Sequence, residues 1–267
     1  MNLKKYMNII AFILALFIFV VINKLLAFTF IILYLLLTNF ATIIYYIGSN
    51  KYKRGKIDQA YKYFKMAYNI KGSPIKIKLY YIYNLLLRGD LDQSEKLLNQ
   101  LSKRKLTSDD EINIKLNMSI VFWKRDNIDG AVSLLMDLYK KYKTTVIYQN
   151  LGYFLILEND YTKALDMNLE GYKFNSSNAG ILDNLGTNYY MLGEYDKSLK
   201  IYEELMINKP SFSSAYYYYA STLIKLNKPE EALLNLKEAL KCNFTFLSAI
   251  SKEEIETKIT EVENSIK

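Results

Sequence analysis

Apolar and polar residues alternate with a helical period along most of this chain. Over 179–192 the apolar positions recur every three or four residues, so they would lie on one helix face. Gly193-Glu194 interrupts this pattern, a second helical stripe follows over 195–206, and Pro210 ends the unit. The spacing predicts two short amphipathic helices joined by a tight turn. Such a hairpin must pack against others of its kind to bury its apolar faces.

The same residues resemble the tetratricopeptide repeat, a 34-residue unit with the pattern W-x2-L-G-x2-Y, then A-x3-F, then P. Leu stands here for Trp, Ser for Ala and Tyr for Phe. The matching residues are Leu182, Leu185, Gly186, Tyr189, Ser198, Tyr202 and Pro210. The resemblance implies an all-α protein, a tetratricopeptide-repeat (TPR) α-solenoid in which helical hairpins form a right-handed superhelix.

Small residues that would seat one helix on the next recur along the chain with spacings of 34, 37, 33, 34 and 34. They are Ala60, Ser94, Ala131, Ala164, Ser198 and Ala232. We therefore expect about twelve helices and no strand over residues 41–246. The six predicted repeats are 41–74, 75–111, 112–144, 145–178, 179–212 and 213–246, followed by a capping helix in 247–267. Turns are expected near Gly55, Gly89, Asp126, Asn159, Gly193 and Asn227.

The N-terminal 50 residues contain two long uncharged runs. They span 6–22 and 25–50, separated by Asn23-Lys24. A membrane-spanning helix needs about 20 apolar residues. The sequence thus predicts a transmembrane helical hairpin over 1–40, with helices at about 6–22 and 25–47 that cross the membrane twice. Because no Gly or Pro lies between Leu25 and Ile47, the second helix is expected to run unbroken into the first repeat. A single long crossing with Lys24 at an interface is the alternative.

The net charge of +8 is concentrated next to these apolar runs. Residues 1–56 hold seven basic side chains and no acid, while the other 211 residues carry 28 basic and 27 acidic ones. This placement indicates membrane topology rather than nucleic-acid binding. Basic residues at both ends of the apolar region predict an integral protein of a bacterial cell membrane with cytoplasmic repeats. An extracytoplasmic envelope-assembly factor with the same fold is the alternative.

The side chains that commonly carry catalysis are scarce. The chain has no histidine and a single cysteine, Cys242, which is expected to be a small buried side chain. Internal disulfides, His/Cys zinc sites and Ser-His-Asp mechanisms are therefore excluded. The sequence contains neither of the two glycine-rich phosphate-binding motifs, G-x-x-x-x-G-K-[ST] and G-x-G-x-x-G. We expect no enzyme, cofactor or metal; an enzyme with an unrecognised site is the remaining alternative.

The first helix of each repeat, in the resembled fold, lines a concave groove. Positions two before the Leu-Gly pair, one after it and four to five after it would face inward. They are largely apolar and aromatic. The candidate groove residues are Tyr83, Leu87, Trp123, Tyr153, Ile156, Leu157, Tyr190, Met191 and Tyr217.

A groove of this kind favours a scaffold or adaptor for a protein or peptide partner, and assembly with other membrane proteins is a further expectation. Packing of these side chains against one another, or against the N-terminal helices, is the competing interpretation.

Overall fold

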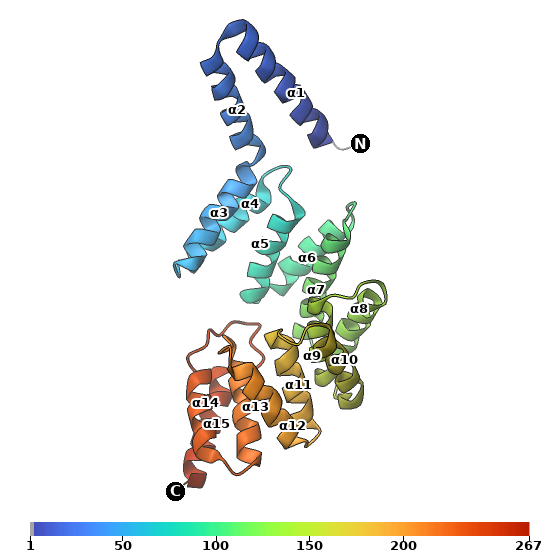
Figure 1. Cartoon of the computed structure of the whole chain (residues 1–267), viewed down its shortest axis with the longest axis vertical. Coiled ribbons are helices and arrows are strands. Elements are labelled where there is room, and N and C mark those ends of the chain that lie inside the picture. Colours follow the sequence, from blue (N-terminus) through green and yellow to red (C-terminus); the bar gives the residue numbers. More distant parts are fainter. Residues whose placement is uncertain (1–2, 267) are drawn as a thin grey trace. The chain divides into compact units, whose positions relative to one another are not determined.

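The computed structural model describes residues 3–266 of the chain (Figure 1). Within this range there are fifteen α-helices, one π-helical segment and no strand. The N-terminal elements are α1 (Leu3–Phe17), the π-helical segment η1 (Ile18–Ile22), α2 (Lys24–Thr38), α3 (Phe40–Lys53), α4 (Ile57–Asn69) and α5 (Ile75–Leu87). The remaining helices are α6 (Leu91–Ser102), α7 (Ser108–Lys124), α8 (Ile128–Lys141), α9 (Thr145–Leu157), α10 (Tyr161–Phe174), α11 (Ala179–Met191), α12 (Tyr195–Met206), α13 (Ser213–Lys225), α14 (Pro229–Ala239) and α15 (Lys252–Ile266).

These helices fall into two compact units, Met1–Asn84 and Leu85–Lys267. The boundary lies inside α5. Over 40–239 the helices number twelve, α3 to α14, which confirms the all-α prediction for the described residues.

The N-terminal unit begins with a helical hairpin of α1, η1 and α2. The chain turns at Asn23, which is extended and accepts a hydrogen bond from the Leu25 amide at 2.7 Å. Tyr34 Oη on α2 donates to Asn8 Oδ1 on α1 at 2.8 Å. Ala15 and Ala27 are buried, and most other apolar side chains of the hairpin are exposed.

The expected uninterrupted helix from Leu25 into the first repeat is wrong. The helix ends at Thr38, and α2 and α3 are bent by 65° at Asn39. Thr38 Oγ1 donates to the Tyr34 carbonyl at 2.8 Å, and Asn39 Nδ2 donates to the Leu35 carbonyl at 2.9 Å. Side-chain hydrogen bonds of this kind compete with the helical ladder and bend helices. In the described part of the chain, no single helix is long and apolar enough to cross a membrane; α2 and α3 satisfy that test only as a bent pair.

The structure shows the expected roles of the periodic small residues and of the turn residues in the helical hairpins. All six periodic small residues, from Ala60 to Ala232, are fully buried. The six expected turns each contain a residue with positive φ, either a glycine or an Asp or Asn that tolerates this region. These turn residues are Gly55, Gly89, Asp126, Asn159, Gly193 and Asn227.

In three of the hairpins a glycine of the first helix also lies against a larger residue of the second helix. A Cβ built on Gly186 would lie 2.8 Å from the Tyr202 ring, and one built on Gly48 would lie 2.9 Å from the Phe64 ring. At the equivalent place between α9 and α10, Asn168 approaches Gly152 in the same way. The Leu-Gly position of the repeat is therefore a close helix–helix contact.

The C-terminal unit is a stack of these hairpins. Successive helices contact one another, and the first helices also contact each other across hairpins: α7 with α9, α9 with α11 and α11 with α13. The last helix, α15, packs on α14 and buries Ile255 and Val262, as expected of a cap. Cys242, which was expected to be buried, is half-buried in the segment before α15.

Candidate functional site

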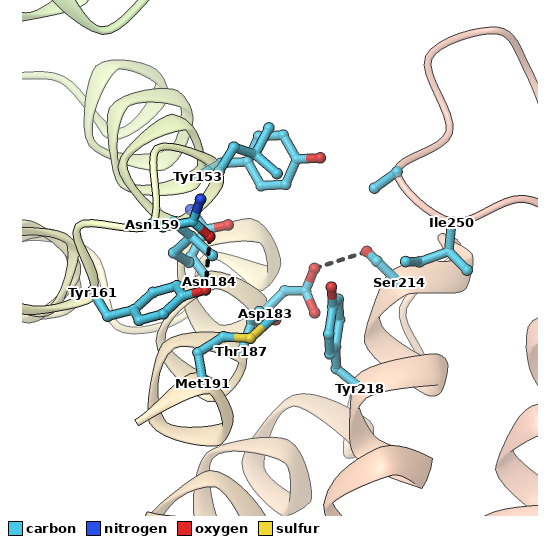
Figure 2. A pocket seen from close by; sticks show the side chains of 13 residues that line it. Tyr153, Asn159, Tyr161, Asp183, Asn184, Thr187, Met191, Ser214, Tyr218 and Ile250 are labelled. Atoms are coloured by element: carbon cyan, nitrogen blue, oxygen red, sulfur yellow. Dashed lines mark hydrogen bonds between the residues drawn. The ribbon is translucent and has the colours of Figure 1, made fainter. Parts of the chain in front are cut away.

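A cavity of about 150 Å³ opens on the first-helix side of the C-terminal unit (Figure 2). It lies between α9, α11 and α13, with the segment before α15 at one side. Its residues are Tyr153, Ile156, Leu157, Asn159, Tyr161, Asp183, Asn184, Thr187, Met191, Ser214, Tyr218, Ala249 and Ile250. Several of them, including Tyr153, Asp183 and Tyr218, keep part of their surface exposed, so the cavity is open to solvent.

Amide side chains fix the helices that form the walls. Asn178 caps α11 by accepting from the Ile181 amide at 2.9 Å. Asn184 Nδ2 donates to the Gln149 carbonyl on α9 at 2.6 Å, and Asn188 Nδ2 donates to the Tyr161 carbonyl on α10 at 2.9 Å. These bonds join α11 to both helices of the preceding hairpin.

Asp183 is the only acid among the described residues that line the cavity. Ser214 Oγ on α13 donates to its Oδ2 at 2.8 Å, and Tyr202 Oη on α12 donates to its Oδ1 at 3.3 Å. Burial raises the pKa of the Asp183 carboxyl from 3.8 to about 7, and the two hydrogen bonds oppose this shift. The carboxylate is therefore held in an environment that disfavours its charge.

Aromatic side chains surround this carboxyl and continue along neighbouring helices. Trp123 meets Tyr153 edge-on, with ring centroids 5.5 Å apart, and Tyr190 lies 5.9 Å from Tyr218. Burial raises the pKa values of Tyr153 and Tyr218, so both phenols stay neutral near pH 7. The first helices thus present neutral aromatic rings from α7, α9, α11 and α13.

The segment between α14 and α15 reaches back to the start of the C-terminal unit. The Phe246 amide donates to the Leu87 carbonyl at 3.4 Å, and its ring lies 3.1 Å from a Cβ built on Gly89. Lys124 Nζ lies 3.8 Å from the Trp123 ring centroid and 5.2 Å from that of Phe246. Burial lowers the pKa of the Lys124 ammonium. Part of the first-helix surface is therefore covered by the protein's own chain.

The nine candidate groove residues do not all come together. Four of them line the cavity: Tyr153, Ile156, Leu157 and Met191. Trp123 and Tyr190 join it through ring contacts, and Leu87 meets the segment before α15. Tyr217 packs with the cluster of α15, and Tyr83 lies in the N-terminal unit with 41% of its surface exposed. Ile156 belongs to the hydrophobic core as well as to the cavity wall.

Sequence reasoning did not select the polar members of the cavity. Asp183 and Thr187 occupy expected inner positions, but the predicted groove contains only apolar and aromatic residues and so leaves them out. Tyr218 faces the cavity in place of its neighbour Tyr217, and Ser214 lies one helical turn before it. A carboxylate at an otherwise apolar inner position is the signal that would have identified the site.

This arrangement is suited to binding a small organic group rather than to coordinating a metal ion. The described residues contain no group of three or more His, Cys, Asp or Glu side chains placed to hold a metal ion. The donors to Asp183 are hydroxyl groups. A cavity of this size accommodates a group comparable to one side chain, since a void of about 150 Å³ holds a benzene-sized molecule.

Comparison with known proteins identifies the fold. The tetratricopeptide repeat family model matches residues 178–207. Among curated proteins, no sequence matches the chain. A solved tetratricopeptide repeat protein from Parabacteroides merdae is 13% identical, with a TM-score of 0.66 and coverage of 84% of each chain.

A chain of the APC/C hetero-tetramer Cut9-Hcn1 is 16% identical, with a TM-score of 0.65; the match covers 83% of this chain and 42% of that one. At these identities the likeness concerns the fold. The described residues are therefore all-α, the chain has the tetratricopeptide-repeat fold over most of its length, and residues 178–207 match the model of that family.

Proposed function

We propose that this chain is a non-catalytic scaffold, anchored in a membrane by its N-terminal hairpin, that binds partner proteins through the first helices of its C-terminal unit. The observation that carries this proposal is the run of partly exposed aromatic side chains on α7, α9, α11 and α13. It consists of Trp123, Tyr153, Tyr190 and Tyr218. Aromatic side chains supply large contact area and tolerate water at their polar tips, so they are favoured anchors at protein interfaces.

The proposed anchoring is supported by the surface of α1 and α2. Large apolar side chains cover the exposed faces of α1, η1 and α2, for example Phe12, Val20 and Leu37. A contiguous apolar surface of this kind needs an apolar partner, and a bilayer is the one we propose. Basic residues flank the apolar region in the sequence and no acid lies among the first 56 residues. The positive-inside tendency then favours cytoplasmic repeats in a bacterial cell membrane.

The proposal of a non-catalytic role rests on the chemistry of the cavity. Its acid accepts hydrogen bonds from two hydroxyls, and the sequence has no histidine that could serve as a base. The walls are formed by tyrosines, aliphatic side chains and amides. Such a lining favours recognition of a partner's side chain over a reaction.

The partner-binding role can be tested by truncating two members of the aromatic run. Trp123→Ala and Tyr153→Ala should each weaken partner binding by about 2 kcal/mol or more, the loss typical of interface anchors. The measurement is crosslinking and affinity capture from detergent-solubilised membranes, with thermal unfolding of the same samples. Leu234→Ala is the control, because Leu234 lies exposed on α14, a second helix.

If both variants capture partners as well as the wild-type chain, the proposed binding surface is wrong. If both melt far below wild type, these residues are structural and the proposal loses its support. The membrane part is tested separately. The full chain should stay with membranes during alkaline carbonate extraction, and protease added to spheroplasts should leave the repeats intact.

A further inference from the structure

The Asp183 carboxylate has no positively charged neighbour in the cavity that it faces. Among the described lining residues, none is a lysine or an arginine. Its two side-chain hydrogen bonds come from the neutral hydroxyls of Ser214 and Tyr202. An ionised carboxylate can accept about four hydrogen bonds, so the group retains acceptor capacity. Figure 2 shows the carboxyl at the centre of the site, beside Tyr218.

The walls around this carboxylate suit a cation. Tyr153, Tyr161 and Tyr218 come from three different helices, and the flexible side chain of Met191 lies among them. The face of an aromatic ring attracts a cation through its quadrupole, and this attraction grows when the cation is desolvated. An acid flanked by tyrosines therefore offers charge and polarisable surface together.

The size of the cavity limits what it can take. At about 150 Å³ it is well below the volume of about 300–1,000 Å³ that is typical of drug-sized or cofactor ligands. A single long side chain is of suitable size, and the lining offers aliphatic surface at Ile156 and Leu157 as well as the carboxylate of Asp183. An anion is disfavoured by the carboxylate. A multivalent metal ion would need further ligands, and among the described lining residues Asp183 is the only acid.

We propose that this cavity binds the cationic group of one lysine or arginine side chain of a partner protein. This inference rests on the proposed function, since it names the chemistry of the partner segment that the first helices receive. The binding would be favoured by relief of the free-energy cost of keeping the Asp183 charge partly buried. The carboxylate is costly when it is alone in an apolar site, and an incoming cation offsets that cost by pairing with it.

The proposal can be tested with small probes and a reporter inside the cavity. The full chain in detergent micelles, labelled at its methionine methyl groups, is titrated with n-butylammonium while the Met191 signal is followed. Met191→Leu assigns that signal. We expect a saturable shift with n-butylammonium and at least tenfold weaker binding of 1-pentanol, a neutral probe of similar shape. Butylguanidinium distinguishes an arginine preference from a lysine preference.

Two kinds of variant separate the charge from the rings. Asp183→Asn keeps the shape and an acceptor for Ser214, and should weaken n-butylammonium binding at least tenfold. Asp196→Asn is the matched control, since Asp196 is an exposed acid on the neighbouring α12. Tyr218→Phe should bind like wild type, whereas Tyr218→Leu should bind more weakly because it lacks the ring.

Three results would overturn the inference: no shift of the Met191 signal, unchanged binding by Asp183→Asn, or equal binding of the neutral probe. Partner capture distinguishes this failure from failure of the proposed function. Undiminished capture by Asp183→Asn, together with loss of capture by Trp123→Ala, would remove the cation site and leave the scaffold proposal standing. Undiminished capture by both Trp123→Ala and Tyr153→Ala would instead remove the scaffold proposal.

Discussion

Two stretches of this chain have similar apolar character and opposite surroundings. One is 6–21 in α1 and η1, and the other is α9, 145–157. In α9 seven residues are buried, and Leu151 has no exposed surface. In α1 the side chains of Ile10, Phe12 and Ile13 are exposed, Phe12 by 70%. Apolar composition alone therefore does not determine whether a helix belongs to a protein core.

The difference follows from the number of helices around each stretch. Within its unit, α9 contacts α7, α8, α10 and α11, and these neighbours bury seven of its thirteen residues. By contrast, within its own unit α1 contacts only α2 and η1 among the described elements, which leaves most of its surface uncovered there. An apolar groove lined by Met7, Leu14 and Phe30 remains between α1 and α2. The repeats supply apolar surroundings for α9, whereas the helices of the N-terminal unit leave most apolar side chains of α1 exposed.

The largest effect is expected from charging the buried stretch. Leu151→Asp places a carboxylate in the hydrophobic core around α9, among buried apolar side chains that cannot pair with its charge. We expect a loss of about 5 kcal/mol or more, because an unpaired buried charge is among the most destabilising changes. Chemical denaturation of the full chain in micelles, followed by circular dichroism, measures it.

Leu234→Asp provides the control for this first change, since Leu234 on α14 is 66% exposed. It should shift the unfolding midpoint little. Equal destabilisation by the two substitutions would contradict the assignment of α9 to a core.

A second prediction concerns the closest contact that α9 makes. A Cβ added at Gly152 would lie 1.9 Å from Asn168 Oδ1 on α10. Asn168 is buried and its Nδ2 donates to Asn188 Oδ1 at 3.2 Å, so it cannot move freely. Gly152→Ala should therefore destabilise the protein by about 2–3 kcal/mol, as overpacking does. Denaturant unfolding measures this loss.

The double variant Gly152→Ala with Asn168→Ala checks the cause of that loss. Removing the amide relieves the clash, so the two changes should cost less together than the sum of their separate effects. Strict additivity would mean that the contact between Gly152 and Asn168 is not what constrains the two helices.

The repeats could be predicted from the sequence because their sequence signals are local. A small residue every 33–37 positions and a Gly, Asp or Asn at each turn fix the hairpins before any long-range contact is known. The bend at Asn39 was missed, since neither Gly nor Pro marks it. The polar pair Thr38-Asn39 inside an apolar run is the feature that signals it, through hydrogen bonds back to the preceding turn.

The cavity was harder to predict from the sequence because it depends on packing between segments that are distant in the chain. Helical spacing identified Tyr153 and Met191, whose positions follow from their own helices. The contribution of Ala249 and Ile250 depends on the path of the segment before α15, which carries no repeat signal. Likewise, Tyr217 faces α15, near Lys258, so its neighbour Tyr218 is the residue left for the cavity.

A third prediction places a charge on α2, the exposed helix that packs against α1. Leu33 on α2 is 54% exposed, so Leu33→Asp should leave unfolding of the repeats unchanged. If the hairpin lies in a bilayer, this charge should reduce membrane retention by about 2.5–3.5 kcal/mol, the insertion cost of a carboxylate near the bilayer centre. Fractionation after alkaline carbonate extraction measures it, with Leu33→Ala as control. Full retention of Leu33→Asp would contradict a position deep in the bilayer.

The smallest effect is expected at the polar exception within the repeats, Asp183. Its carboxyl has a pKa of about 7 in the folded protein and an ordinary value of 3.8. The folded state thus binds this proton more tightly, so the contribution to stability is fully present below pH 3.8 and is lost as pH rises through 7. A shift of this size corresponds to an upper limit of about 4 kcal/mol, and because the group is partly exposed we expect about 1–2 kcal/mol.

Asp183→Asn removes this ionisation, so the variant should be more stable than wild type at pH 8 and nearly equal to it at pH 4. Denaturant unfolding of the full chain in micelles at several pH values measures the difference, with Asp196→Asn as control. The nearby titratable groups, Tyr153, Tyr202 and Tyr218, have raised pKa values and stay neutral over this range.

A ligand that binds only the folded state stabilises it by mass action. Saturating n-butylammonium at pH 8 should therefore raise the stability of wild type toward that of Asp183→Asn and leave the variant unchanged. A difference between the two proteins that is constant from pH 4 to pH 8 would show that Asp183 carries no costly charge in the cavity.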